Sequence, residues 1–400
     1  MAPYIICFTI SCIFARLDEF FRKKNSKPLS VCFALLAILI PCILAGARNI
    51  GVGTDTIAYA SPLFHTIRLH NYNIIELFQS PYSSNIEPVT LLLYYFVSVV
   101  FDDIFWALFF TELICLLPVY LAIRASSIKS ELKWLALFTY FCLFYCFTLN
   151  IMRQMMATCV LLYAFKYLKQ KETGKYLIIV LLSMLIHKTA ILGIFVWILY
   201  ATCSGKRFYL NDITDIKYLS KKKSKFARIN EKLYHNRVIL LILYILVGIS
   251  ILFLIRNIIE ALAFIKPSFA YQLENINFSF NPSVAPFCLM ILYIIPGLLI
   301  YRKMVKKQIE YRFMVFACFM AVILWQLQGI SSEMYRMAFY FWVFIIFAVP
   351  YFIQGFSDKQ TRIFFTIYYV FLMCVNWYYY FVICNAGEVV PYTSQLLGIT

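Results

Sequence analysis

Charged residues are scarce in this chain, and their scarcity indicates its class. Only 14% of the 400 residues are Asp, Glu, Lys or Arg, whereas a soluble domain averages about 25%. Hydrophobic residues make up 63% of the chain and aromatic residues 19%, and the mean hydropathy is +0.79. Such a composition is typical of a protein that crosses a membrane several times. We therefore expect an all-α fold, a polytopic transmembrane helix bundle.

The sequence also lacks the short motifs of several large enzyme classes. It has no Gly-x-Gly-x-x-Gly, no phosphate loop of the Walker type, no His-Glu-x-x-His and no Gly-x-Ser-x-Gly. Its 13 cysteines form no Cys-x-x-Cys pair, and most lie within apolar runs as small packing residues. Nucleotide hydrolysis, zinc chemistry and serine-hydrolase chemistry thus have no support, and we expect neither a metal nor a cofactor.

Basic residues are distributed unevenly along the chain. Of the 36 Lys and Arg, 29 lie in six short stretches: 16–28, 124–133, 166–175, 204–237, 302–312 and 356–362. Positive charge gathers in the cytoplasmic loops of membrane proteins. We therefore expect these stretches in the cytoplasm, with 204–237 as a basic loop near anionic lipid. Because the net charge of +17 lies in such loops, we expect no nucleic-acid partner.

The apolar runs predict a single integral membrane domain over residues 1–400, with about 12–13 membrane segments. The thirteen candidates are 4–15, 29–47, 88–101, 104–123, 132–149, 152–168, 176–187, 189–203, 238–256, 284–301, 313–329, 336–355 and 363–383. Several are shorter than the roughly 20 residues of a full crossing. If 88–101 and 104–123 both crossed, the basic stretch 124–133 would lie outside. We therefore expect 88–101 to be re-entrant or incomplete.

Three stretches are expected on the outer side: the loop 48–87, the loop 257–283 and the tail 384–400. Within the first two, 57–78 and 257–280 mix apolar and polar residues in a manner that suits interfacial helices on the membrane surface.

The outer loop begins with a polar motif from Arg48 to Tyr59. It places Arg48, Gly53, Thr54 and Asp55 directly after the apolar run 29–47. A charge at the mouth of a membrane helix loses hydration and therefore needs a reason. Glycine permits a turn that brings Arg48 and Asp55 to one cavity. Asp55 is either a base or the cap of the next helix.

Two further arginines stand at the outer starts of apolar runs, Arg153 next to Gln154 and Arg336 near the end of the chain. A helix N-terminus attracts anions, and the guanidinium fork binds phosphate oxygens in pairs. The alternatives are an interfacial arginine that reaches lipid headgroups and, for Arg336, a helical ion pair with Glu333.

His187 lies at the outer turn of a predicted helical hairpin. Histidine is the usual general base near neutral pH, although a lone histidine at an interface is also common as a structural residue. Glu87, which precedes Pro88, is expected to cap the run that follows.

Taken together, these stretches resemble the EpsG-like branch of the Wzy-type polysaccharide polymerases. The resemblance is carried by Arg48…Gly53-Thr54-Asp55…Tyr59, Glu87-Pro88, Ile151-Met152-Arg153-Gln154, His187-Lys188-Thr189-Ala190, Arg336 and Pro391-Tyr392.

The resemblance implies a metal-independent glycosyltransferase in the bacterial inner membrane, a multi-pass enzyme of capsule, O-antigen or exopolysaccharide synthesis. Its substrates would be oligosaccharide units on undecaprenyl pyrophosphate, within the lipid bilayer, and a chain-length regulator and a flippase are further expected partners. In such an enzyme one set of residues would bind pyrophosphate and another would act as the base. These are Arg48, Arg153 and Arg336 for pyrophosphate, His187 or Asp55 as the base, and Gly53, Thr54, Tyr59, Glu87 and Gln154 in support.

His187 is favoured over Asp55 as the base, because the reference pKa of aspartate is about 3.9. The rival interpretation is a lipid-linked oligosaccharide flippase or another membrane transporter, in which polar residues mark a path across the membrane. Against it, the outer-side charges bunch at the surface, with Glu112 as the main charge inside an apolar run.

Overall fold

The structure, a computed structural model, describes residues 1–83, 85–204, 283–306, 309–329 and 334–400. Most of these residues are helical, and the described part contains no strand beyond an isolated bridge between Ser394 and Ile399. The all-α fold is therefore confirmed. The predictions for 204–237 and 257–283 fall almost entirely outside the described residues.

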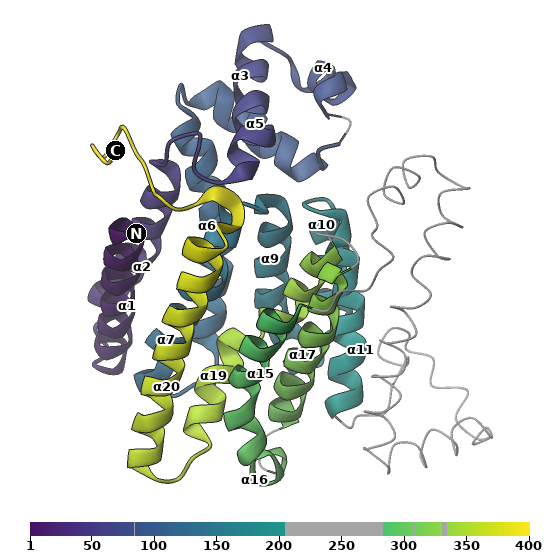
Figure 1. Cartoon of the computed structure of the whole chain (residues 1–400). Helices are drawn as coiled ribbons and strands as arrows, with labels where there is room; N and C mark the ends of the chain where they lie inside the picture. Colours follow the sequence, from purple (N-terminus) through teal and green to yellow (C-terminus); the bar gives the residue numbers. More distant parts are fainter. Residues whose placement is uncertain (84, 205–282, 307–308, 330–333) are drawn as a thin grey trace, which may run out of the picture.

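Long helices run side by side to form a bundle (Figure 1). Its helices are α1 (Ala2–Lys23), α2 (Lys27–Gly46), α6 (Ile104–Ala125), α7 (Lys133–Tyr140), α8 (Cys146–Thr148), α9 (Met152–Lys169), α10 (Thr173–Met184), α11 (Gly193–Ser204), α15 (Val284–Leu299), α16 (Tyr301–Val305), α17 (Ile309–Trp325), α18 (Phe339–Trp342), α19 (Ile345–Gln354) and α20 (Lys359–Tyr378). The cap on one end of the bundle consists of α3 (Ser61–His70), α4 (Ile74–Gln79) and α5 (Pro88–Val100). Short 3₁₀ and π-helical segments join or extend these helices: η1 (Thr56–Ala60), η2 (Pro81–Ser83), η3 (Ser130–Leu132), η4 (Phe141–Tyr145), η5 (Lys188–Leu192), η7 (Gln326–Gly329), η8 (Met334–Ala338), η9 (Tyr379–Ile383) and η10 (Ala386–Glu388).

Membrane-spanning capacity is distributed over several helices. Within the described residues, four are long and apolar enough to cross a membrane: Lys27–Gly46, Ile104–Ala125, Glu310–Gly329 and Lys359–Ile383. The pair Met334–Trp342 and Ile345–Gln354, bent by 41°, makes a fifth if it counts as one span. Four apolar helices are shorter: Pro88–Val100, Thr173–Met184, Lys188–Ser204 and Val284–Leu299. The chain is thus a multi-pass membrane protein in which several apolar runs are too short for a full crossing.

The cap explains why the run 88–101 conflicts with the pattern of charge. Its helix α5 has 13 residues and lies with α3 and α4 beyond the end of the bundle (Figure 1). The backbone N–H of Val89 donates to the carbonyl of Leu185, at the end of α10, at 3.0 Å. Because α5 stays at this end, α6 alone carries the chain from the cap to the stretch 124–133. The Lys- and Arg-rich stretches that the structure describes then all lie at the end of the bundle remote from the cap (Figure 1).

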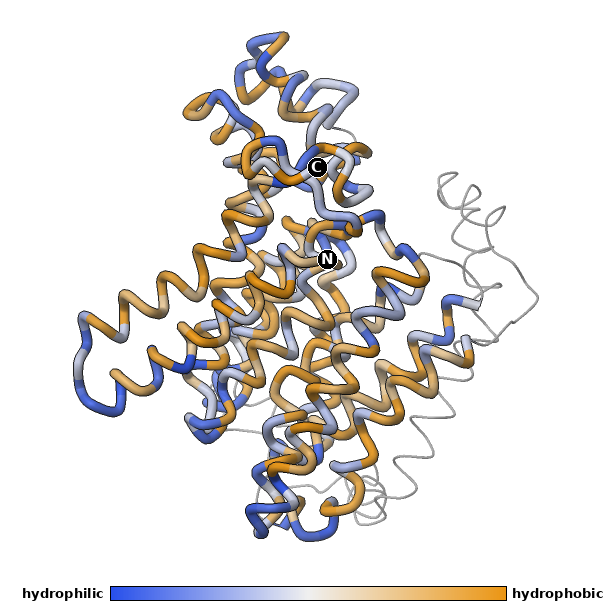
Figure 2. Tube along the Cα trace, turned by 60° about the vertical axis from the view of Figure 1, so that its left-hand side comes forward, coloured by the Kyte–Doolittle hydropathy of each residue, from blue (hydrophilic) through white to orange (hydrophobic). Residues whose placement is uncertain are grey.

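Hydrophilic residues gather at the two ends of the bundle, with apolar segments between them (Figure 2). At the end remote from the cap, buried charges join three helices. The carboxylate of Asp18 accepts from the hydroxyl of Tyr120 at 2.7 Å and from Arg124 Nη2 at 3.2 Å. Glu19 pairs with Lys133 at 3.3 Å. These contacts fix α1 against α6 and α7, because a buried charge without a partner is costly.

The C-terminal tail packs against the motif that follows α2. The Tyr392 hydroxyl donates to the carbonyl of Leu44 at 2.7 Å, and the Asn49 N–H donates to the carbonyl of Thr393 at 2.9 Å. The tail therefore lies at the cap end, over the turn that leaves α2 (Figure 1).

Candidate active site

Arg48 holds together the turn that leaves α2. Its side chain is 5% exposed, and its Nη1 donates to the carbonyl of Ala45 at 2.6 Å. Nε donates to the carbonyl of Val52 at 3.1 Å, and Nη2 to the Thr56 hydroxyl at 3.2 Å. Nη2 also contacts Met152 Sδ at 3.4 Å. These contacts show that Arg48 stabilises the turn. Its predicted role in binding pyrophosphate stays a prediction.

Gly53 allows this turn to approach the start of α9. Its φ is +88°, a conformation that glycine adopts without strain, and a Cβ there would collide with the carbonyl oxygen of Leu149. The close approach lets the backbone N–H and the hydroxyl of Thr54 both donate to Asn150 Oδ1. The two polar motifs, 96 residues apart in sequence, thus form one surface.

Asp55 caps the first turn of α9 from another part of the chain. Its Oδ2 accepts from the Met152 N–H at 3.0 Å, which satisfies a free donor of the helix N-terminus. Burial raises the pKa of Asp55 to about 6, although the Met152 N–H opposes the rise. The positive charges of Arg153, Arg336 and Arg48 oppose it too. All three predicted arginines therefore lie within electrostatic reach of one carboxyl group.

Arg153 connects α9 to the cap. Its Nη1 donates to Glu87 Oε2 at 2.7 Å and to the carbonyl of Asn85 at 2.8 Å. Its guanidinium lies over the ring of Tyr59, 4.7 Å from the centroid. The side chain remains 24% exposed, and Nε and Nη2 make no hydrogen bond to the described residues. Arg153 is thus held in place through one nitrogen of its guanidinium group.

Glu87 is also the partner of His187. His187 Nδ1 and Glu87 Oε1 lie 2.7 Å apart. Burial alone would raise the pKa of Glu87, but the hydrogen bond to His187 and the charge of Arg153 outweigh it and lower the pKa to about 2. Glu87 is therefore ionised near neutral pH and can only accept, so Nδ1 of His187 carries the proton. The lone pair of the neutral imidazole is then on Nε2, as a general base requires.

Gln154 ties α9 to η8, which carries Arg336. The Gln154 side chain is 5% exposed, and its Nε2 donates to the carbonyl of Arg336 at 2.6 Å. Next to it, the hydroxyls of Thr189 and Tyr340 lie 2.9 Å apart and join η5 to α18. These bonds hold Arg336 beside the start of α9.

All of the residues selected from the sequence therefore lie in one neighbourhood, where the cap, the turn after α2, η5 and η8 meet the start of α9. The role of Glu87 is larger than the helix cap that the sequence predicts, since it links Arg153 to His187. Asn150 was not selected as a site residue, although its position at the start of an apolar run with Arg153 was a usable signal. Within the described residues, no group of three His, Cys, Asp or Glu side chains is placed to hold a metal ion.

The fold and this neighbourhood define a helical, multi-pass membrane protein with arginines, carboxylates and a histidine gathered at one end of its bundle. The chain belongs to the EpsG family, whose model matches residues 31–394. The resemblance noted in the sequence is thus confirmed, and membership places the protein in polysaccharide biosynthesis with a polymerase-type role. Neither the curated proteins nor the solved structures contain a match.

Proposed function

We propose that this protein joins oligosaccharide repeat units carried on undecaprenyl pyrophosphate, at the outer face of the bacterial inner membrane. Family membership supports the general role. The observation that carries the proposal is the meeting of Arg153, Glu87 and His187, from three separate parts of the chain, through contacts of 2.7 Å. In the reaction the growing glycan leaves its lipid pyrophosphate and passes to a sugar hydroxyl of the next lipid-linked unit.

The leaving group accounts for the arginines. When the bond between the anomeric carbon and the phosphate oxygen breaks, negative charge grows on the pyrophosphate, and fixed cations stabilise it. Arg153 and Arg336 serve this purpose at the start of α9, where the free N–H groups of the helix also favour an anion. Arg48 holds the turn that brings Asp55 to the same place.

The acceptor hydroxyl accounts for the histidine. As its oxygen bonds to the anomeric carbon, the hydroxyl proton passes to Nε2 of His187. Glu87 keeps the imidazole in the required tautomer and stabilises the imidazolium that forms, a division of labour known from other enzymes with a histidine base. With its pKa near 6, Asp55 is a better base than its reference value suggests. Its contact with the Met152 N–H holds it at the start of α9, where we propose that the leaving group binds. We assign Asp55 the orientation of the substrate.

The outer face is proposed on the distribution of charge. The cap and the C-terminal tail lie at the site's end of the bundle (Figure 1), while the described basic turns lie at the other end. The positive-inside rule then directs the basic end to the cytoplasm, so the site faces the side where lipid-linked units are polymerised.

The contacts of Glu112 favour a polymerase over a transporter. Glu112 is 1% exposed and accepts from the hydroxyls of Tyr140, at 2.8 Å, and Thr148. Tyr140 and Thr148 flank the π-helical segment η4, so the carboxyl group bridges the two sides of this segment between α7 and α8. The Glu112 carboxyl group is buried and has protein partners, whereas a transport path needs polar groups that line a route across the membrane.

A deletion strain tests the proposed function. Without the polymerase, single repeat units should accumulate on the lipid carrier at the outer face, where a sugar-reactive label that cannot cross membranes modifies them in intact cells. Loss of a flippase would instead leave the units on the cytoplasmic face, unlabelled until the cells are broken. The second result would contradict the proposal.

A further inference from the structure

The turn that carries Asp55 is held at three consecutive residues, each by a different part of the chain. The backbone N–H of Gly53 donates to the carbonyl of Glu388, in the C-terminal tail, at 3.2 Å. The N–H of Thr54 donates to Asn150 Oδ1 at 3.1 Å, and the Thr54 hydroxyl donates to the same oxygen. Asp55 itself caps the start of α9. The position of its carboxylate therefore depends on the tail and on Asn150 as well as on α9.

Asn150 lies between this turn and the tail. Its side chain is 9% exposed, and its oxygen is occupied by Thr54. On the other side is Gly387, whose φ of +76° suits glycine. A Cβ at Gly387 would collide with the Asn150 amide, and the amide nitrogen is the first atom that it would meet. A methyl group at position 387 would therefore push the amide out of its contact with Thr54.

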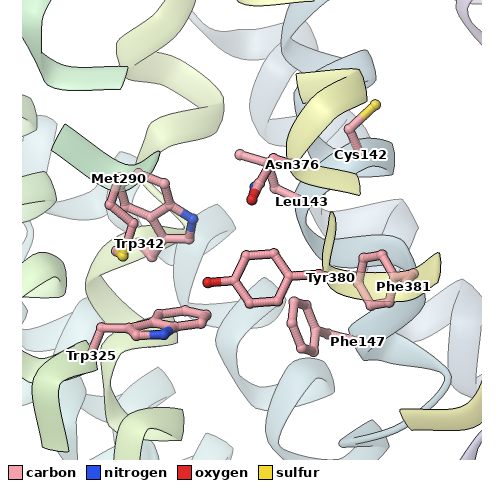
Figure 3. Close-up of a pocket in the computed structure, with 9 residues that line it drawn as sticks. All are labelled: Cys142, Leu143, Phe147, Met290, Trp325, Trp342, Asn376, Tyr380 and Phe381. Atoms are coloured by element: carbon pink, nitrogen blue, oxygen red, sulfur yellow. The ribbon is translucent and has the colours of Figure 1, made fainter. Parts of the chain in front are cut away.

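Aromatic packing fixes the place where the tail leaves the bundle. Phe381 lies on η9, just before the tail, and its ring centroid is 5.1 Å from that of Phe147; Figure 3 shows both rings at the side of a small cavity within the bundle. One turn earlier, Trp377 Nε1 contacts Cys146 Sγ at 3.3 Å. Phe147 precedes Asn150 by three residues. The tail thus starts beside the segment that carries Asn150.

The tail is also fixed beyond η10. The hydroxyl of Tyr4, on α1, donates to the carbonyl of Val389 at 2.8 Å, and the hydroxyl of Ser394 donates to the carbonyl of Ala47 at the end of α2. Val389 and Tyr392 are both buried. Because the tail is anchored on both sides of η10, it gives the turn a fixed support.

We propose that Asn150 is a positioning residue for Asp55 and that the C-terminal tail holds it in place through Gly387 and Glu388, an inference that rests on the proposed function. Without either support the turn moves, and the Asp55 carboxylate moves with it from the place where it orients the substrate. A misplacement of about 1 Å can cost about 10²-fold in rate. Turnover should therefore report the loss more strongly than stability does.

Two substitutions remove the support from different sides. Asn150→Ala takes away the acceptor of Thr54, and Gly387→Ala displaces the Asn150 amide. With purified enzyme and lipid-linked repeat units, assayed well below the melting temperature, each variant should lose turnover about 10²-fold. The matched control is Gly398→Ala in the same tail, where φ is +65° but nothing lies near the added methyl group; it should keep wild-type turnover. Normal turnover in both test variants, or an equal loss in the control, would overturn the proposal.

A double-mutant cycle separates positioning from a general loss of structure. If Asn150 and Gly387 act through Asp55, then adding Asn150→Ala or Gly387→Ala to Asp55→Asn should lower turnover by less than about twofold further, because residues that act as one unit have non-additive effects. Independent structural roles predict the same loss of about 10²-fold in both backgrounds. That second pattern would overturn the assignment of Asn150 as a positioning residue.

Amide hydrogen exchange tests the support without polymer synthesis. The N–H groups of Gly53 and Thr54 are hydrogen-bonded, so a peptide that covers residues 50–56 should exchange slowly in the wild type. Its exchange should accelerate in Gly387→Ala and not in Gly398→Ala, while peptides from α9 keep their protection in both. Unchanged exchange in Gly387→Ala would overturn the proposal even where the wild type makes polymer. The expected exchange in a wild type that makes no polymer would support the role of the tail and contradict the proposed function alone.

Discussion

The charge of Asp55 should cost the protein stability, although the residue supports activity. The variant Asp55→Asn, which removes only the charge, should therefore be more stable and less active. Burial raises the pKa of this carboxyl from 3.8 to about 6. At about 1.4 kcal/mol for each tenfold change in proton affinity, holding it ionised costs up to about 3 kcal/mol at neutral pH. Asparagine keeps an oxygen for the Met152 N–H but carries no charge. The variant should therefore be more stable than the wild type at pH 7.5.

The pH dependence provides the check on this prediction. An acid whose pKa is raised by folding stabilises the protein fully below its unfolded pKa, and this stability is lost as the pH rises through the folded pKa. The advantage of Asp55→Asn should thus be largest above about pH 6 and shrink towards pH 4. Melting temperatures in detergent at several pH values measure it, alongside polymer synthesis, which should fall. A variant that is less stable at every pH would refute the argument.

Three further predictions follow from the site. Arg153→Lys and Arg336→Lys should abolish most polymer synthesis at normal expression, because lysine cannot contact two phosphate oxygens at once; long polymer from both variants would make the arginines lipid anchors. His187→Ala should reduce turnover about 10²- to 10⁴-fold with little change in binding of lipid-linked units, and full turnover would move the base to Asp55. Gly53→Ala should destabilise the protein by about 1–3 kcal/mol, as measured by thermal unfolding, whereas Gly51→Ala, which has open space around it, should not.

The distribution of basic residues predicts the orientation of the protein in the membrane, and cysteine labelling tests this orientation directly. In a cysteine-free background, Leu69→Cys on the cap, where Leu69 is 81% exposed, should react in intact cells with a thiol reagent that cannot cross membranes. Lys171→Cys, in the basic turn between α9 and α10, should react only after the cells are opened. The reverse pattern would place the site in the cytoplasm and rule out the proposed face.

Several properties of the site depended on features that sequence patterns do not encode. Glu87 and His187 are 100 residues apart, and each alone is compatible with a helix cap or an interfacial residue. Only the position of the cap over the bundle joins them, and with them Arg153. The raised pKa of Asp55 is likewise a property of burial, so the reference value that favoured His187 over Asp55 is too low for this site.

The sequence by itself determined the class and the family, and it named the residues that the fold brings together at the candidate site. Apolar runs, basic loops and short polar motifs are local features, and each one carries its physical meaning without knowledge of the fold. The tertiary structure decided that α5 lies in the cap, that Arg48 is enclosed by its own turn, and that Glu87 binds two partners. These depend on which segments lie side by side, because hydrogen bonds and burial act over a few ångströms of space rather than along the chain.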